Sequence, residues 1–527
     1  MNYLPTQRTL TYIFFTLLLI STCVVQGIYQ INNTKQEYHL ELVKIDQADS
    51  NGSFGGFNLF VIERHDAVTW NIINRTLVIS DLKGNLYFSK EIETGGPLAN
   101  YAAEFINSTT ILYGDSEGAC LFNIETNTTR QLSFYGHHDY EKNYANNTYF
   151  ALSGESIEIN NDVYLFDRII EYSDNGTELW NVNSTSFVNY TQWCPYEDME
   201  GFFRDVTHSN TIFYDEDEDC IYLNSRNLNT FYKIDHKTGE LLWSLGEYGN
   251  FTLFDLNGNE KDILFYHAHA LEKIAANKFM LFDNDEHNQT NVMNHHSRLL
   301  EITIDIDKKY ANASWEWISP VEYFRGWWGD SDLLPNNNRM GVFKSACLVE
   351  VNETGDIVWE YDFTATGSNT YSIYKAERFC SSPVVSAPIF VDEGEGSGYL
   401  EWNVWYNYRS KTEFTGKYHI MVDNEEVELG PVVFPKYWQS IQLRYNITSV
   451  YLEAHEFSLI VEDEGGHLSN ITDRFSPIGS LSYESITKSG LILGLSLGLG
   501  IPFLAAIITI IWRKIIKKKP LLKRKIK

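Results

Sequence analysis

Basic residues are scarce in this 527-residue sequence outside its last fifteen positions. The chain has 41 Lys and Arg against 70 Asp and Glu, which gives a formal net charge of −29. Nine of the positive residues lie in 513–527, and removing them together with Arg8 changes the net charge of the remainder from −29 to −39. Without its basic tail the chain has few positive residues that could neutralise the phosphates of a nucleic acid. We therefore expect no nucleic-acid partner. We interpret the acidity as a feature of solubility.

Cysteine is also rare, and nothing in its placement indicates a metal site. Five of the six cysteines lie beyond residue 28, an odd number, so at least one is free or pairs between chains. They are too scattered for the ligand spacing of a zinc site. His267 and His269 could form a metal pair and Asp215–Asp219 could bind calcium, but we interpret them as a polar pair and an exposed turn. We expect no metal and no cofactor.

Only two long apolar runs occur, and they predict the topology. The run 10–25 lies within 1–28, a signal peptide or an uncleaved N-terminal anchor. The second lies within 489–512, is long enough to cross a bilayer, and is followed at once by the basic tail 513–527. Because positive flanks stay in the cytoplasm, we expect a cell-membrane protein with an extracellular ectodomain and a cytoplasmic C-terminus. The chain crosses the membrane once, or twice if the N-terminal leader is not cleaved. Many N-x-S/T sequons before the tail fit a glycoprotein.

No convincing helical periodicity appears between the leader and about residue 363. Short β-type runs recur instead, and aromatic residues make up 15% of the chain. Repeated units combine a polar turn, usually with Gly, and a strand that carries Trp or Phe. They read DLKGNLYF from Asp81, SDNGTELW, DHKTGELLW, DIDKKYANASW, NETGDIVW and a poorer IETNTTRQL. An apolar run such as CIYLN or FMLFD precedes each one, and we interpret it as an inner strand.

Six such units predict an all-β fold that begins with a six-bladed β-propeller over 38–380. The later tryptophans are 44 to 72 residues apart, the range of one four-stranded blade with variable loops. The alternative is a run of unrelated hairpins in a sandwich. The constant order of apolar strand, turn and Trp strand favours the propeller.

The pattern changes after about residue 382. The stretch PIFVDEGEGSG has the composition of a linker, and several short alternating strands follow it. Their number and spacing predict a small immunoglobulin-like β-sandwich over 385–478, without the Cys-Trp-Cys pattern of antibody domains. We interpret this sandwich as a stalk between the propeller and the C-terminal transmembrane helix.

Histidines stand at equivalent positions of consecutive blades. His208, His269 and Asp330 each precede or open a strand, at intervals of 61 residues. Arg226 and Arg298 follow the next strands. We therefore expect the two histidines and the two arginines to converge at the mouth of the central channel.

The region 202–363 resembles the arylsulfotransferase family, the kind that works without PAPS and is built on a six-bladed propeller. The resemblance is carried by the following motifs: Thr207-His208-Ser209-Asn210, Asn224-Ser225-Arg226, TGELLW, His269-Ala270, Phe282-Asp283-Asn284, Ser297-Arg298 and Leu334-Pro335-Asn336. It implies ping-pong transfer of a sulfuryl group through a histidine, from an aryl sulfate donor to a phenolic acceptor. It also implies His269 and His208 as catalytic residues, with Arg298, Arg226 and Asn210 binding the substrate.

The sequence departs from the family at one position. Asp330 stands in the blade where the resemblance places the sulfate-accepting histidine. Neutral imidazole is a nucleophile and arginine binds sulfate oxygens, so His269 remains our preferred nucleophile and His208 the alternative. Trp327-Trp328 beside Arg325 could line an aromatic pocket, whereas the pairs at 137–138 and 295–296 are expected to be solvated. The alternative function is a non-catalytic surface propeller that binds a glycan, a peptide or an envelope partner.

Overall fold

The computed structural model is almost entirely β-sheet. It describes residues 52–93, 102–192, 194, 203–285, 295–363, 369–394, 397–447 and 455–475. Turns and short 3-10 segments such as η1 (Ser184–Ser186) and η3 (Val321–Tyr323) join the strands. Among the described residues, no helix has the length and apolarity needed to span a membrane. The expected leader, transmembrane helix and basic tail all lie outside these residues.

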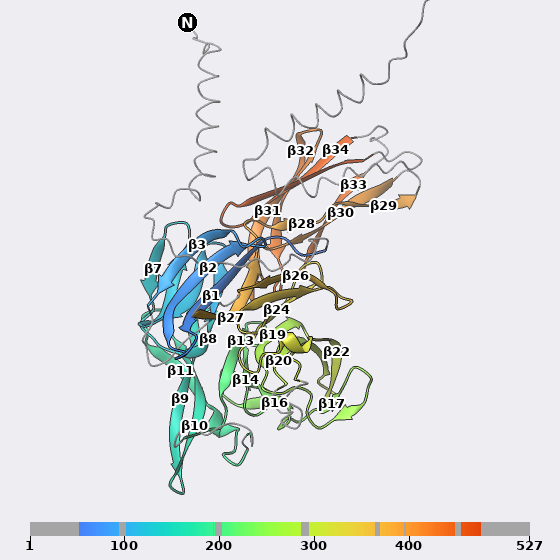
Figure 1. Cartoon of the computed structure of the whole chain (residues 1–527). Coiled ribbons are helices and arrows are strands. Elements are labelled where there is room, and N and C mark those ends of the chain that lie inside the picture. Colours follow the sequence, from blue (N-terminus) through green and yellow to red (C-terminus); the bar gives the residue numbers. More distant parts are fainter. Residues whose placement is uncertain are drawn as a thin grey trace, which may run out of the picture.

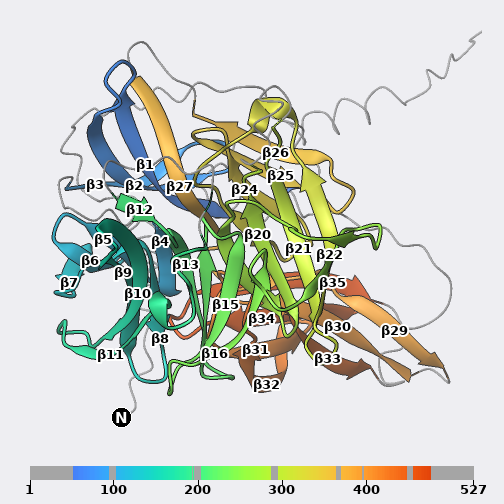
Figure 2. The same ribbon diagram turned by 90° about the horizontal axis from the view of Figure 1, so that it is seen from below.

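Six sheets, each built on four antiparallel strands, succeed one another along the chain and surround a common centre (Figure 2). The first three sheets, from the inner strand outward, consist of β27 (Asn369–Phe379), β1 (Phe57–Asp66), β2 (Ile72–Asp81) and β3 (Leu86–Ile92); of β4 (Ala103–Asn107), β5 (Thr110–Asp115), β6 (Gly118–Asn123) and β7 (Thr128–Gln131); and of β8 (His137–Asn143), β9 (Thr148–Ile159), β10 (Asp162–Tyr172) and β11 (Glu178–Asn183), with β12 (Phe203–Asp205) parallel to β10.

The other three sheets repeat the same order. They consist of β13 (Ser209–Asp215), β14 (Cys220–Ser225), β15 (Thr230–Asp235) and β16 (Leu241–Gly246); of β19 (His269–Ala275), β20 (Lys278–Asp283), β21 (Arg298–Asp305) and β22 (Tyr310–Ile318), extended by β17 (Thr252–Phe254) and β18 (Glu260–Lys261); and of β23 (Ser331–Leu333), β24 (Arg339–Phe343), β25 (Cys347–Val351) and β26 (Ile357–Asp362). The first sheet is closed by its last strand, because β27 pairs with β1.

Apolar clusters between neighbouring sheets complete the ring. Each consecutive pair of sheets encloses one cluster, and the sixth cluster lies between the last sheet and the first. Its members come from both ends of the ring, for example Phe60 and Ile62 of β1 with Met340 and Val342 of β24. A closed ring of meanders around an axis is the arrangement of a propeller-like fold. The structure thus confirms the all-β prediction.

The repeated polar turns lie where the sequence places them. Gly84, Gly176, Gly239 and Gly355 all adopt positive φ, between 72° and 88°, in the turn that joins the third and fourth strands of their sheets. In the first of these turns the Asp81 carboxylate accepts the amides of Lys83 and Asn85 at 2.9 and 2.8 Å. Glycine suits this conformation because it has no Cβ to clash.

The apolar strands that we interpreted as innermost lie one or two positions further out. CIYLN belongs to β14 and FMLFD to β20, and each is the second strand of its sheet. The true inner strands face the axis of the ring and therefore carry charged residues, such as Glu272 of β19 and Lys375 of β27. Their polarity conceals them in a search for apolar runs.

Two further sheets form a sandwich at one end of the molecule, drawn from orange to red in Figure 1. One contains β28 (Val384–Val385), β29 (Ile389–Gly394), β30 (Ser397–Trp405) and β33 (Ile441–Ile447); the other contains β31 (Phe414–Val422), β32 (Glu425–Phe434), β34 (His455–Glu462) and β35 (Leu468–Phe475). Trp402, Ile420 and Leu459 are fully buried between them. The stretch expected to be a linker is instead the β29–β30 hairpin.

The connecting segments of the sandwich pack against the ring. Trp438 is buried in the cluster between the last and first sheets, and Tyr437 packs against Phe213 at 5.8 Å between ring centroids. Arg409 contacts Glu272 on the inner strand β19. Lys411 lies 2.9 Å from Glu104 on β4 and also contacts Glu141 on β8.

Arg409 and Lys411 partly neutralise an excess of buried acidic side chains on the axis of the ring. A cavity of about 50 Å³ there is lined by three bases, Lys375, Arg409 and Lys411, and by five acids, Glu104, Glu272, Asp330, Asp332 and Glu377. Burial raises the pKa of Glu272 to about 7 and raises that of Asp332 well above its usual value. The ring therefore depends on positive charge that the sandwich supplies.

We expect removal of the Lys411 charge to destabilise the ring. Lys411→Met keeps the apolar stem but leaves Glu104 and the buried Glu141 without their cation, so the free energy of unfolding should fall by about 3 kcal/mol. Lys417→Met is the matched control, since Lys417 forms an exposed pair with Glu462, and it should lose less than about 1 kcal/mol. Denaturant titration of the purified protein measures both. Equal losses would contradict a role for the sandwich in neutralising the axis.

Candidate functional site

Histidines from three neighbouring inner strands meet at one end of the axis. β8 and β19 begin with His137 and His269, and His208 directly precedes β13. The ring of His138 lies 5.1 Å from that of His208, measured between centroids. His138 and His269 both pack against Tyr374 of the closing strand β27, at 6.0 and 6.1 Å.

His269 is buried in a hydrogen-bond network that fixes its tautomer. The amide nitrogen of Asn284 donates to the carbonyls of Arg325 and Trp328, both at 2.8 Å, so its Oδ1 must be an acceptor. Nδ1 of His269 lies 2.8 Å from this oxygen and therefore carries the proton. The Nε2 lone pair accepts the Trp328 amide at 3.3 Å. His269 is thus a neutral imidazole whose Nε2 is covered by the Trp328 peptide.

His208 is more accessible. Its Nδ1 lies 2.6 Å from the carboxylate of Asp205, the last residue of β12, and 32% of the side chain is exposed. The Asp205 carboxylate also accepts the His208 amide at 3.1 Å, which holds the residue at a left-handed φ of 41°. A carboxylate at Nδ1 holds a proton on that nitrogen and so leaves Nε2 as the nitrogen that can react, as in an activated catalytic histidine.

His137 and His138 were missed as site residues and were expected to be solvated. Nε2 of His137 lies 3.1 Å from the buried Asp167, and its Nδ1 lies 2.7 Å from Nδ1 of His138. A signal was present in the sequence, because this pair opens the inner strand one sheet before His208. The long insertion before His208 obscured the repeat.

Positive charge surrounds these histidines. Burial lowers the pKa of His269 well below its usual value, and the charge of Arg226 lowers it further. Burial and Arg226 also lower the pKa of His267 to about 3. Arg325 is buried too, with its guanidinium bound to three backbone carbonyls, and burial lowers its pKa to about 9. The site is therefore cationic, and burial together with this charge disfavours protonation of His267 and His269.

Aromatic rings form the remaining wall. Trp328 and Tyr374 meet edge to face at 5.7 Å, and the Arg325 guanidinium lies 5.6 Å from the Trp328 ring centroid. The Tyr374 hydroxyl donates to the carbonyl of Asn210 at 3.1 Å. Trp327 is 55% exposed. An aromatic wall beside cations suits a planar aromatic anion.

Two predicted residues, Arg298 and Asn210, are bound by other partners. Arg298 binds Asp283 at 2.7 Å, Glu316 at 2.5 Å and the Leu264 carbonyl, so all its nitrogens are engaged by other partners than the histidines. The Asn210 side chain is fully buried and bound to the Ala268 carbonyl and to Asn224. The expected convergence thus extends to His208, His269 and Arg226 but not to Arg298.

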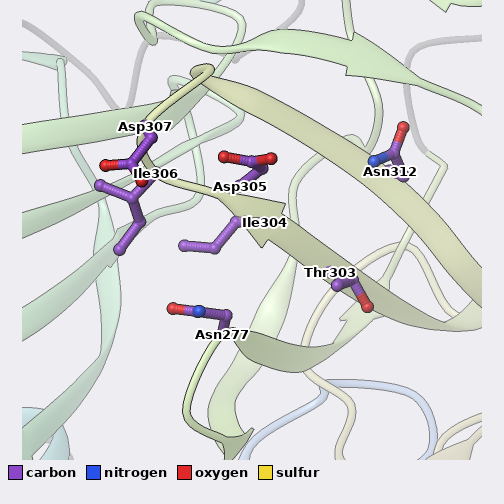
Figure 3. Close-up of a pocket in the computed structure, with 7 residues that line it drawn as sticks. All are labelled: Asn277, Thr303, Ile304, Asp305, Ile306, Asp307 and Asn312. Carbon is purple, nitrogen blue, oxygen red and sulfur yellow. The ribbon is translucent and has the colours of Figure 1, made fainter.

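The weaker candidates also have structural partners. His267 lies 3.3 Å from the sulfur of Cys194, and in the acidic run Asp215 pairs with Lys273. In the described chain one other group has metal-ligand spacing, Cys347 with Glu360 and Asp362, but Lys344 already lies 3.0 Å from that aspartate. An open hollow of about 590 Å³ at the β21–β22 turn is polar and contains none of the histidines (Figure 3).

Comparison with known families identifies the family of the chain. A family model for arylsulfotransferase (ASST) matches residues 58–349, more than half of the chain. The chain belongs to the arylsulfotransferase family. The matched region includes the four histidines 137, 138, 208 and 269 together with Arg226, and it ends before β27, so Tyr374 lies outside it.

In this chain, Asp330 occupies the position equivalent to His208 and His269. Its carboxylate accepts the amide of Ala376 on β27 at 2.8 Å, and burial raises its pKa. Asp330 thus fastens the closing strand. No curated protein matches the chain.

Solved structures similar to this chain include two proteins of low sequence identity. The periplasmic gluconolactonase PpgL of Pseudomonas aeruginosa is 8% identical, with a TM-score of 0.32 over 74% of this chain and 99% of that one. Hydrazine synthase of Kuenenia stuttgartiensis is 7% identical, with a TM-score of 0.31 over 61% and 80%. Likenesses at this level carry no conclusion.

Acid should destabilise the protein through His269. Its neutral form is favoured in the folded state, whereas the unfolded chain takes up a proton below about pH 6.5, so stability is lost as the pH falls. Between pH 7 and 5, wild type should lose about 2 kcal/mol more unfolding free energy than His269→Gln.

His236→Gln supplies a control of opposite sign. Burial lowers the pKa of His236, but hydrogen bonds to Glu171 and Asp219 outweigh it and raise the pKa. The contribution of protonated His236 to the free energy of unfolding is complete below pH 6.5 and disappears as the pH rises. As the pH falls, the stability of wild type should therefore increase relative to that of this variant. Parallel pH dependence of both variants and wild type would rule out the assigned protonation states.

Proposed function

We propose that the protein transfers a sulfuryl group from an aryl sulfate to a phenol, through a covalent histidine intermediate and without PAPS. The observation that carries the proposal is the meeting of several histidines with buried arginines and an aromatic wall, in a chain of the arylsulfotransferase family. We take the ring as a six-bladed propeller and the C-terminal sheets as an immunoglobulin-like sandwich, as the sequence predicts.

His208 is our candidate for the group that accepts the sulfuryl. Its side chain is 32% exposed, whereas that of His269 is buried and its Nε2 lies under the Trp328 amide. Nε2 of His208 attacks sulfur, the bond from sulfur to the phenolic oxygen breaks, and a phenolate leaves. Asp205 on Nδ1 stabilises the positive charge that the imidazole gains. This exchanges the roles that the sequence suggested for the two histidines.

Electrostatics support an anionic substrate. Arg226 and Arg325 are both buried near His269, and Arg325 is bound by carbonyls rather than by a carboxylate. Cations preorganised in a site of low dielectric constant stabilise the charge that develops on the sulfuryl oxygens. His269 then acts beside the nucleophile, as a neutral acceptor that holds the Trp328 peptide in place.

A colorimetric assay tests the function and the roles together. Wild type should release nitrophenol from a nitrophenyl sulfate only when a second phenol is present, with PAPS omitted. His208→Ala should abolish this release, because it removes the nucleophile. His455→Ala is the control, since this exposed histidine of the sandwich pairs with Asp423, and it should retain full activity.

Two outcomes would revise the proposal. Full activity of His208→Ala with an inactive His269→Ala returns the nucleophile to His269. Binding of the aryl sulfate without transfer by wild type favours the alternative, a non-catalytic surface protein. The aspartate at position 330 in place of a histidine is the observation that keeps this alternative open.

We also propose that the ectodomain faces the outside of the cell and that 489–512 anchors it. The basic tail directly after this apolar run supports the orientation. Protease added to intact cells should remove the chain before about residue 489 and spare 513–527, as followed by antibodies to each part. Protection of the ectodomain would show the opposite orientation.

A further inference from the structure

Asp167, His137 and His138 form a chain of hydrogen bonds that ends at the histidine cluster. Oδ2 of Asp167 accepts the Thr207 hydroxyl at 2.7 Å and the Ser209 amide at 2.5 Å, and Oδ1 lies 3.1 Å from Nε2 of His137. Burial raises the pKa of Asp167, but the bonds from His137, Ser209 and Thr207 outweigh it and lower the pKa. Asp167 is therefore a carboxylate, and Nε2 of His137 must donate to it.

The short contact between the two rings then permits two arrangements in which His138 is neutral. Nδ1 of His137 and Nδ1 of His138 are 2.7 Å apart, so one of them donates and the other accepts. In the first arrangement His137 is neutral, and His138 donates from Nδ1 and carries a lone pair on Nε2. In the second, His137 is doubly protonated beside Asp167, and His138 is neutral with its proton on Nε2. The heavy atoms need not move between them.

A local backbone irregularity places the rings of His137 and His138 in this chain of hydrogen bonds. The pairing of β8 with β9 shifts register between His137 and Tyr140, and His138 has a left-handed φ of 61°. A bulge of this kind re-aims side chains and is common next to active sites. Left-handed φ is uncommon for a non-glycine residue, so the surrounding structure must hold it.

We propose that Asp167, His137 and His138 are a proton relay that takes the proton from the acceptor phenol and returns it to the next departing phenolate. The relay rests on the sulfuryl transfer proposed above and adds its acid–base step. His138 touches the phenol and is the catalytic residue, whereas His137 and Asp167 act through it as positioning residues.

The proton balance closes over one cycle. The O–H bond of the acceptor breaks as an N–H bond forms at Nε2 of His138, and its Nδ1 proton passes to Nδ1 of His137. The phenolate oxygen then bonds to sulfur and the bond from sulfur to histidine breaks. In the next donor step the same proton returns through His138 to the leaving phenolate, so relay and nucleophile regain their starting states.

A relay is needed because His138 alone is a poor base. Burial lowers its pKa well below the usual value, and the groups that face it, His137, His208, His269 and Arg226, lower it further. A charge placed on His138 would be repelled by that arginine. The relay moves the charge to His137, where the carboxylate of Asp167 lies 3.1 Å away. A positive charge on His137 is attracted by this carboxylate, whereas the same charge on His138 would be repelled by Arg226. The charge is therefore more stable on His137.

Acceptor phenols of different acidity test the relay. His137→Gln keeps an acceptor for Nδ1 of His138 but cannot take the proton. With phenols of pKa about 10, it should lower kcat/KM for the acceptor about 100-fold, the usual contribution of general base catalysis. With nitrophenols of pKa about 7, which are already ionised at neutral pH, the loss should be below about threefold. The retained nitrophenol activity also reports that the variant is folded.

His138→Phe and Asp205→Asn complete the comparison. His138→Phe should show the same dependence on phenol acidity as His137→Gln, whereas Asp205→Asn, which weakens the nucleophile, should slow all acceptors alike. A uniform loss for His137→Gln, or no loss with any phenol, overturns the relay while leaving sulfuryl transfer intact. An inactive wild type overturns the transfer itself, so the two failures are distinguishable.

Discussion

The pairing of β27 with β1 is the interaction on which the rest of the structure depends. It joins residues about three hundred positions apart and turns a row of sheets into a ring. The same strand presents Tyr374 to the histidines and Lys375 to Asp139, at 3.1 Å. Arg378 pairs with Glu350 at 3.1 Å, with both side chains fully buried. Ring closure and assembly of the site are therefore one event, and a weakened β27 would lose both.

An axis lined by inner strands has two polar ends with different electrostatics. At one end, Arg226 and Arg325 lie near imidazoles that stay neutral. Toward the sandwich, buried carboxylates exceed the bases, and Arg409 and Lys411 reduce the imbalance. Two regions of opposite sign along one axis orient an anion toward the histidines and disfavour its passage further in.

Sequence reasoning succeeded where local chemistry decides the structure. Gly84 and its counterparts marked four turns, because a positive φ favours glycine. It failed where neighbours decide. The inner strands were overlooked because they are polar, and Arg298 was assigned to the site although Asp283 and Glu316 bind it. His138 was overlooked because the long insertion before His208 obscured the repeat, and its contact with Tyr374 joins residues about 236 positions apart along the chain.

Neutral histidines among buried cations couple proton binding to anion binding. Without an anion, burial and the charge of Arg226 keep His138 and His269 unprotonated. A sulfate ester between these groups brings a negative charge within a few ångströms, which offsets the guanidinium charge and raises the proton affinity of the imidazoles. Protons become available only when the leaving group that needs one is present. The unfavourable burial of Arg226 and Arg325 thus prepares the site for a charged aromatic ester.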